Sequence, residues 1–109
     1  MLSIQSNRLT KLEGLEKLVN LEELYLSHNG IEKIESLEHN TKLTVLDVTS
    51  NRLTNLSGLS HLKALTDFWC SYNQISSFTE ITEQLGLLPE LDTVYFEGNP
   101  VQLTNPTAY

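Results

Sequence analysis

Imidazole and thiol groups are the first candidates for metal binding or nucleophilic catalysis in this chain. The three histidines, His28, His39 and His61, do not share a spacing that places two imidazoles on one metal ion. The single cysteine, Cys70, occupies an apolar position of the repeated pattern described below, so we expect a buried and inert thiol. The sequence therefore predicts no metal site and no cofactor.

Carboxylate pairs are the second candidate, because two acids of different pKa can act as general acid and general base. Glu22 with Glu23, and Glu32 with Glu35, are such pairs. We expect them at exposed positions, where a charge is simply solvated and no pocket holds a small-molecule substrate. Phosphate-binding loops, dinucleotide fingerprints and catalytic-triad spacings are not found either. These observations favour a protein that is not an enzyme.

Aromatic residues interleaved with acidic residues offer a different chemistry, that of protein recognition. Trp and Tyr are the residue types that contribute most to binding when a partner covers them. The candidate partner-binding residues are Glu23, Tyr25, Asp47, Asp67, Trp69, Tyr95 and Glu97. The carboxylates would meet Lys or Arg of the partner and set orientation and association rate. The alternative is a solvated face on which Tyr25 or Trp69 packs against long neighbours.

A repeated pattern explains why these residues share one face. Apolar residues recur before an asparagine in the form Leu-x-x-Leu-x-Leu-x-x-Asn-x-Ile. The asparagines are Asn7, Asn29, Asn51, Asn73 and Asn99, at intervals of 22, 22, 22 and 26 residues. Five copies in register match the leucine-rich-repeat consensus. Each asparagine amide can satisfy backbone groups at the turn, so we expect a buried asparagine ladder.

The alternation of apolar and variable residues ahead of each asparagine predicts short strands. They are expected near residues 2–4, 24–26, 46–48, 68–70 and 94–96. Stacked in parallel, they form a concave sheet whose outward positions are the variable ones. We predict an α/β leucine-rich-repeat solenoid, with residues 1–109 as a single domain.

The opposite, convex side is predicted from a second periodicity. Apolar residues recur every third position, as in Leu53, Leu56, Leu59 and Leu62, and a period of 3.0 is that of a 3₁₀-helix. We therefore expect short 3₁₀ turns there.

The 26-residue repeat departs from this pattern. Ser77-x-x-Glu80 resembles a capping box, and Gly86 and Pro89 are stop signals. We expect one or two turns of α-helix in this insertion.

The composition sets the broad class. A chain of 109 residues with 39% hydrophobic and 19% charged residues is typical of a folded protein. Apolar runs are too short to cross a bilayer, and a lone cysteine favours a reducing intracellular location, nuclear or cytoplasmic. The net charge of −7 disfavours a nucleic acid partner and fits a partner with a basic patch, while the lack of a long apolar run disfavours a membrane partner.

Neither end of the sequence shows the polar cap that normally covers the core of a solenoid. The chain opens with residues 1–4 inside a strand and stops at residues 105–109, soon after the last asparagine. We therefore expect a segment of a longer protein, of marginal stability by itself. Five rungs span about 20 Å, which offers less than the roughly 800 Å² per partner of a standard interface. The segment alone is expected to bind weakly.

Several stretches resemble a particular family, the leucine-rich regulatory subunit 7 of protein phosphatase 1 (suppressor-of-dis-two type). They are residues 1–10, 24–31, 68–69 and 91–95, which are similar to the C-terminal repeats of that family. The resemblance implies a non-catalytic subunit that holds the phosphatase catalytic subunit on its concave sheet.

The same resemblance implies four contact positions, which are Asp47, Asp67, Trp69 and Tyr95. Asp67 stands where the family carries glutamate, so its charge is kept and its reach is shorter. A generic leucine-rich-repeat adaptor that binds a different protein is the alternative.

Overall fold

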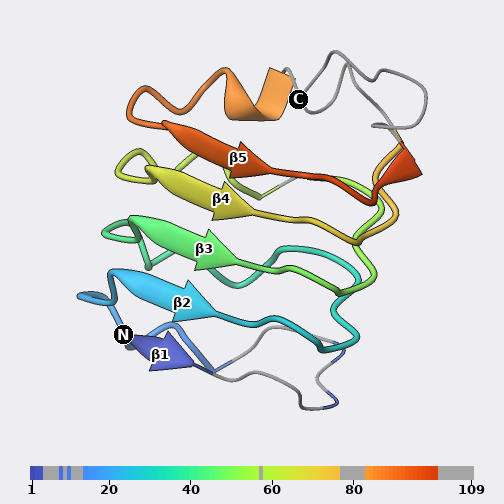
Figure 1. Cartoon of the computed structure of the whole chain (residues 1–109). Helices are drawn as coiled ribbons and strands as arrows, with labels where there is room; N and C mark the ends of the chain where they lie inside the picture. Colours follow the sequence, from blue (N-terminus) through green and yellow to red (C-terminus); the bar gives the residue numbers. More distant parts are fainter. Residues whose placement is uncertain (4–7, 9, 11–13, 57, 77–82, 101–109) are drawn as a thin grey trace.

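The computed structural model describes residues 1–3, 8, 10, 14–56, 58–76 and 83–100. Within them, five short strands form one parallel sheet whose order follows the chain (Figure 1). The strands are β1 (Leu2–Ser3), β2 (Glu23–Tyr25), β3 (Val45–Asp47), β4 (Asp67–Trp69) and β5 (Thr93–Tyr95). Each turn of the chain lays one strand beside the previous one, which confirms the predicted solenoid.

The register of the sheet follows the sequence repeat. Leu24 pairs with Leu46, Leu46 with Phe68, and Phe68 with Val94. Residues at equivalent positions of successive repeats therefore lie side by side and form rows that run across the sheet.

Strands β2 to β5 each lie one residue nearer the N-terminus than predicted, whereas β1 begins at Leu2 as predicted. The pairing nevertheless continues beyond the strand ends, because the Leu26 N–H donates to the Asp47 carbonyl at 2.8 Å and the Cys70 N–H donates to the Tyr95 carbonyl at 2.7 Å. Hydrogen-bond assignment of such short elements commonly shifts their ends by one or two residues.

The core lies between the sheet and the turns on the opposite side. The strand residues Leu24, Leu46 and Phe68 are fully buried, as are leucines of the turns such as Leu56 and Leu62. Burying each such side chain contributes about 1.5–3 kcal/mol. Apolar burial within every repeat therefore holds the solenoid together.

Cys70 belongs to this core, as predicted. Its side chain is only 1% exposed, and burial raises the pKa of the thiol to about 12. The group stays protonated near neutral pH and is shielded from reagents.

Single turns recur on the side opposite the sheet. The Leu62 N–H donates to the Leu59 carbonyl at 2.9 Å, and the Leu65 N–H donates to the Leu62 carbonyl at 3.1 Å. These are hydrogen bonds of the 3₁₀ type, made once every three residues rather than as a continuous helix. Every third side chain returns to the core, which explains the sequence period.

The insertion of the long repeat contains α-helix. Residues 83–85 are helical and precede β5 (Figure 1). The predicted capping box at Ser77 and Glu80 lies outside the described residues. Among the residues described, no helix has the length and apolar character needed to span a membrane.

The asparagine ladder is confirmed for three repeats. The Asn73 amide donates to the carbonyls of Val48 at 3.0 Å and Cys70 at 2.9 Å, while its oxygen accepts from the Leu53 N–H at 2.9 Å. Asn51 and Asn99 make the equivalent contacts and are also buried. Asn29 is half-buried and donates to the Leu26 carbonyl at 3.0 Å. Asn7 lies outside the described residues.

Candidate protein-binding site

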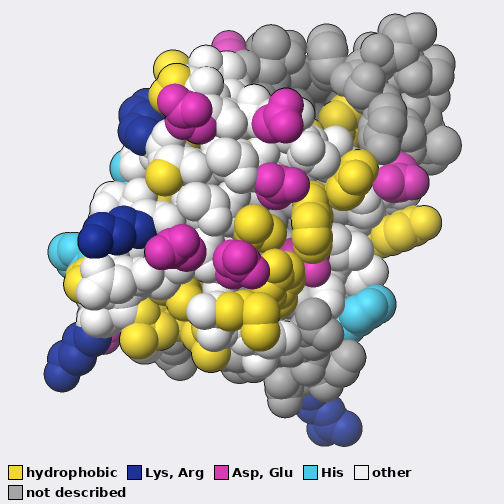
Figure 2. Space-filling view, turned by 60° about the vertical axis from the view of Figure 1, so that its left-hand side comes forward, with side chains coloured by type: hydrophobic (Ala, Val, Ile, Leu, Met, Phe, Trp, Pro, Cys, Tyr) yellow, Lys and Arg dark blue, Asp and Glu magenta, His cyan; other side chains and the backbone are white. Residues whose placement is uncertain are grey.

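The outer side of the sheet carries six of the seven predicted binding residues. The pairing register aligns Tyr25, Asp47, Trp69 and Tyr95 in one row. Glu23 and Asp67 lie in the adjacent row, and Glu97 follows two residues after β5. We call the surface formed by these seven residues the acidic–aromatic face. Figure 2 shows hydrophobic and acidic side chains side by side on this region of the molecule.

The aromatic rings form a continuous row. The ring centroids of Tyr25 and Trp69 are 6.1 Å apart with the planes tilted by 47°, and those of Trp69 and Tyr95 are 6.1 Å apart and tilted by 36°. Neighbouring strands are separated by about 4.8 Å, so β2 and β4 are about 9.6 Å apart across β3. Tyr25 and Trp69 must therefore lean toward each other over β3.

Asp47 of β3 lies beneath this leaning pair. Its carboxylate accepts a hydrogen bond from the Thr49 N–H at 2.9 Å, and the side chain is only 7% exposed. The row position is the predicted one, but the neighbouring rings limit access to the carboxylate. Asp47 thus places negative charge under the aromatic row rather than at its surface.

The other carboxylates of the face are more accessible and partly ordered. The Tyr25 hydroxyl donates to Glu23 Oε1 at 2.8 Å, and this hydrogen bond to a carboxylate raises the pKa of Tyr25 above its usual value. The Thr66 hydroxyl donates to Asp67 Oδ1 at 2.8 Å. Glu97 is exposed. At the described positions of these rows no lysine or arginine is present, so the face itself supplies no cation to offset the carboxylates.

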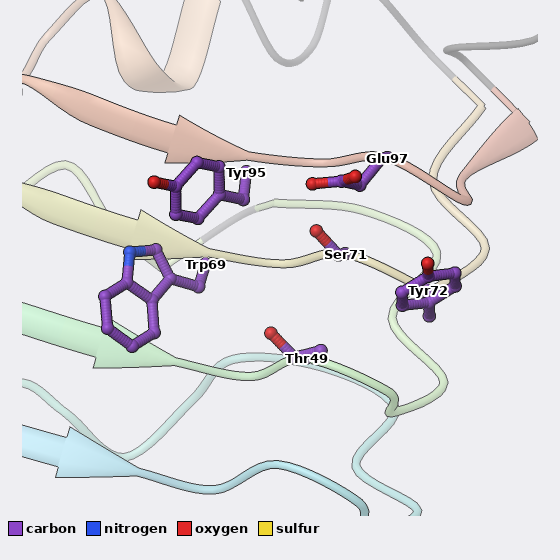
Figure 3. Close-up of a pocket in the computed structure, with 6 residues that line it drawn as sticks. All are labelled: Thr49, Trp69, Ser71, Tyr72, Tyr95 and Glu97. Atoms are coloured by element: carbon purple, nitrogen blue, oxygen red, sulfur yellow. The ribbon is translucent and has the colours of Figure 1, made fainter.

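An open depression of about 310 Å³ lies at the carboxyl ends of β3, β4 and β5 (Figure 3). Its lining consists of Thr49, Trp69, Ser71, Tyr72, Tyr95 and Glu97. Three of these residues, Thr49, Ser71 and Tyr72, were not among the predicted binding residues. Tyr72 is 61% exposed, and the signal in the sequence was an aromatic residue at a variable position directly before Asn73.

Trp69 has one unsatisfied polar group. The indole N–H is buried and has no hydrogen-bond partner among the described residues. In Figure 3 the indole nitrogen lies on the side of the ring toward Tyr95. A buried donor without an acceptor costs about 1–3 kcal/mol, which offsets part of the stability that packing of the aromatic row provides.

The repeats match a known family model. The model, described as leucine rich repeats (2 copies), covers residues 1–39 and 41–83. The chain belongs to the leucine-rich-repeat family.

Among curated proteins, the chain is similar to protein phosphatase 1 regulatory subunit SDS22. Identity is 60% over 35 residues with the protein from Schizosaccharomyces pombe, which is 32% of this chain and 10% of the relative. It is 61% over 33 residues with the protein from Saccharomyces cerevisiae, 30% of this chain and again 10% of the relative. The predicted resemblance is confirmed, and the match spans about a tenth of the length of each relative.

Solved structures agree on the fold. The SNF/U2A′ complex of Drosophila melanogaster contains a chain that matches with a TM-score of 0.84 at 24% identity, over 97% of this chain and 62% of that chain. An internalin (InlF) from Listeria monocytogenes matches with a TM-score of 0.80 at 31% identity, over 88% of this chain and 28% of that chain.

Proposed function

We propose that this chain is part of a non-catalytic regulatory subunit that binds the catalytic subunit of protein phosphatase 1 through the acidic–aromatic face. The choice of partner is supported by the local identity of 60% and 61% with two regulatory subunits of that phosphatase. An intracellular location, nuclear or cytoplasmic, belongs to the same proposal.

The choice of surface is supported by the continuous row of Tyr25, Trp69 and Tyr95. These rings touch one another, and Tyr95 remains 42% exposed. Exposed aromatic surface is costly in water and becomes favourable when a partner covers it. Carboxylates on the same face attract a basic surface and orient it before the rings are buried.

The test is a calorimetric titration of the phosphatase catalytic subunit against the chain at high micromolar concentration, because a small interface is expected to be weak. The unmodified chain should bind. The double variant Trp69→Ala/Tyr95→Ala should bind at least about tenfold more weakly, since central aromatic residues each contribute on the order of 1–2 kcal/mol.

Leu87→Ala is a suitable control, because Leu87 is 52% exposed and lies outside the acidic–aromatic face. It should bind like the unmodified chain. If the double variant also binds like the unmodified chain, the proposed surface is wrong. If the unmodified chain does not bind at all, the partner is a different protein.

A further inference from the structure

We propose that the depression at the carboxyl ends of β3, β4 and β5 receives the guanidinium group of an arginine from a protein partner. Tyr72 and Glu97 would select this side chain. The inference rests on the proposed function of the acidic–aromatic face as a protein-binding surface. It adds a subsite to that face and names the chemistry of its occupant.

Aromatic rings stand on two sides of the depression. Figure 3 shows Trp69 and Tyr95 on one side and Tyr72 on the other, with Ser71 and Thr49 between them. A cation near the face of an aromatic ring is attracted by the ring quadrupole, and arginine is found in such contacts more often than lysine. The planar guanidinium also stacks on aromatic rings.

The backbone and a neighbouring glycine fix the position of Tyr72. Tyr72 adopts a left-handed conformation with φ 58°, as do His28 and Ser50 at the same repeat position. A Cβ on Gly98 would lie 2.3 Å from Tyr72 Cδ1, so only glycine at that position leaves room for the ring. Tyr72 is therefore held as an exposed wall although it is not buried.

The remaining lining groups are hydrogen-bond acceptors for a cation. Glu97 is exposed, and in Figure 3 its carboxylate lies above the hydroxyl groups of Ser71 and Thr49. Arginine presents five N–H donors in one plane, which suits a carboxylate and two hydroxyl oxygens better than the compact ammonium of lysine does. The volume of about 310 Å³ suits one side chain rather than a segment of chain.

Charge favours the same occupant. Asp47, Asp67 and Glu97 surround the aromatic rings, and the described positions of the face carry no lysine or arginine. A cation entering the depression would meet uncompensated negative charge and three aromatic rings. An apolar side chain would leave the carboxylate of Glu97 without a partner.

Trp69 provides the readout, because it is the single tryptophan of the chain and lines the depression. We would titrate the chain with the peptide acetyl-Gly-Arg-Gly-amide and follow tryptophan fluorescence and the NMR signal of the indole N–H. The arginine peptide should give a saturable change. The matching lysine peptide should bind several-fold more weakly, and the citrulline and leucine peptides should show no saturation.

Two variants test the assigned residues, and one provides a control. Tyr72→Leu and Glu97→Gln should each weaken binding of the arginine peptide at least about threefold, because each removes one attraction of the order of 1 kcal/mol. Glu90→Gln removes an exposed carboxylate outside the depression with the same change in net charge, and should leave binding unchanged. Retained NMR dispersion would show that all three variants fold.

Three outcomes would overturn the proposal. They are the absence of a saturable response to the arginine peptide, an equal response to citrulline or leucine, and an equal loss in Glu90→Gln. The phosphatase titration separates this inference from the proposed function. Phosphatase binding without arginine-peptide binding overturns the subsite alone, and peptide binding without phosphatase binding overturns the proposed partner alone.

Discussion

Asn73 shows how one polar side chain connects successive repeats. It donates to carbonyls of its own repeat and of the preceding one, and it accepts from the Leu53 N–H. These backbone groups lie where the chain turns, and they take no part in the hydrogen bonds between strands of the sheet. Since Asn73 is only 6% exposed, water cannot replace it.

We therefore expect Asn73→Ala to destabilise the chain by about 2 kcal/mol or more, because the buried Leu53 N–H loses its acceptor at a cost of about 1–3 kcal/mol. The carbonyls of Val48 and Cys70 each lose one of two amide donors and keep the other. Urea unfolding followed by circular dichroism measures this change. Asn20→Ala is the control, since Asn20 is exposed and its contact with Lys42 lies at the surface. The control should cost less than about 1 kcal/mol. Equal effects of the two substitutions would contradict the ladder as a stabilising element.

At the residue scale, burial of the Cys70 thiol also predicts how the stability of the folded chain depends on pH. Folding raises the pKa of its thiol from 9.0 to about 12 because burial disfavours the thiolate. The unfolded chain therefore releases this proton at lower pH than the folded chain does. The stabilising contribution is complete below about pH 9 and is lost as the pH rises toward 12.

The measurement is urea unfolding of the chain and of Cys70→Ala at several pH values from about 8 to 11. The free energy of unfolding of the unmodified chain should fall relative to the variant, with a slope approaching about 1.4 kcal/mol per pH unit above the unfolded pKa. The comparison removes the contributions of the other titrating groups. Parallel pH profiles of the two proteins would show that the thiol does not titrate differently on folding.

At the scale of elements, the aromatic row links strands that are not neighbours. Tyr25 of β2 and Trp69 of β4 touch across β3, whereas Tyr25 and Tyr95 are separated by Trp69. A double-mutant cycle with Tyr25→Ala and Trp69→Ala should give a coupling of about 0.5–1.5 kcal/mol, which is typical of aromatic pairs. The matched cycle with Tyr25→Ala and Leu87→Ala should be additive within about 0.5 kcal/mol, because Leu87 is exposed and lies outside the aromatic row. Additivity in both cycles would mean that the ring contact contributes nothing to stability.

The repeat period was enough to predict the strands, their order and the rows of the sheet. Every repeat places equivalent residues at equivalent positions, so the register of the sequence repeat fixes which residues share a row of the sheet. The leaning of Tyr25 and Trp69 over Asp47 was not predictable in this way. It depends on side-chain rotamers on three strands, which a linear pattern does not contain.

Two further features escaped the pattern for related reasons. Asn40 stands at the repeat position of Leu18 and Leu62, yet it is fully buried and its amide donates to the carbonyls of Leu15 and Leu18, both at 3.0 Å. A search for apolar residues at every third position does not detect a buried polar residue such as Asn40. Tyr72 borders a depression only because Gly98, one repeat later, lacks a side chain.

At the scale of the whole molecule, each repeat adds one strand to the sheet and so lengthens its outer surface. Contacts run between consecutive strands, in the order β1 to β5. Such a solenoid is stabilised by its repeats and by the interfaces between neighbours. The acidic–aromatic face spans four of the five strands, so its charge acts on a partner as one field rather than as single ion pairs.

The distribution of charge within the total of −7 then predicts how association depends on salt. If a basic surface of the phosphatase meets the acidic–aromatic face, Glu23→Gln and Glu97→Gln should each lower the association rate constant about twofold or more at low ionic strength. Glu38→Gln and Glu90→Gln change the net charge equally at exposed positions outside the face and should have smaller effects. In about 1 M salt the Debye length is only about 3 Å, so the rates of all variants should converge. Stopped-flow mixing with the catalytic subunit measures these rates. Equal effects of the face and control variants at low salt would mean that total charge, and not the acidic–aromatic face, guides the encounter.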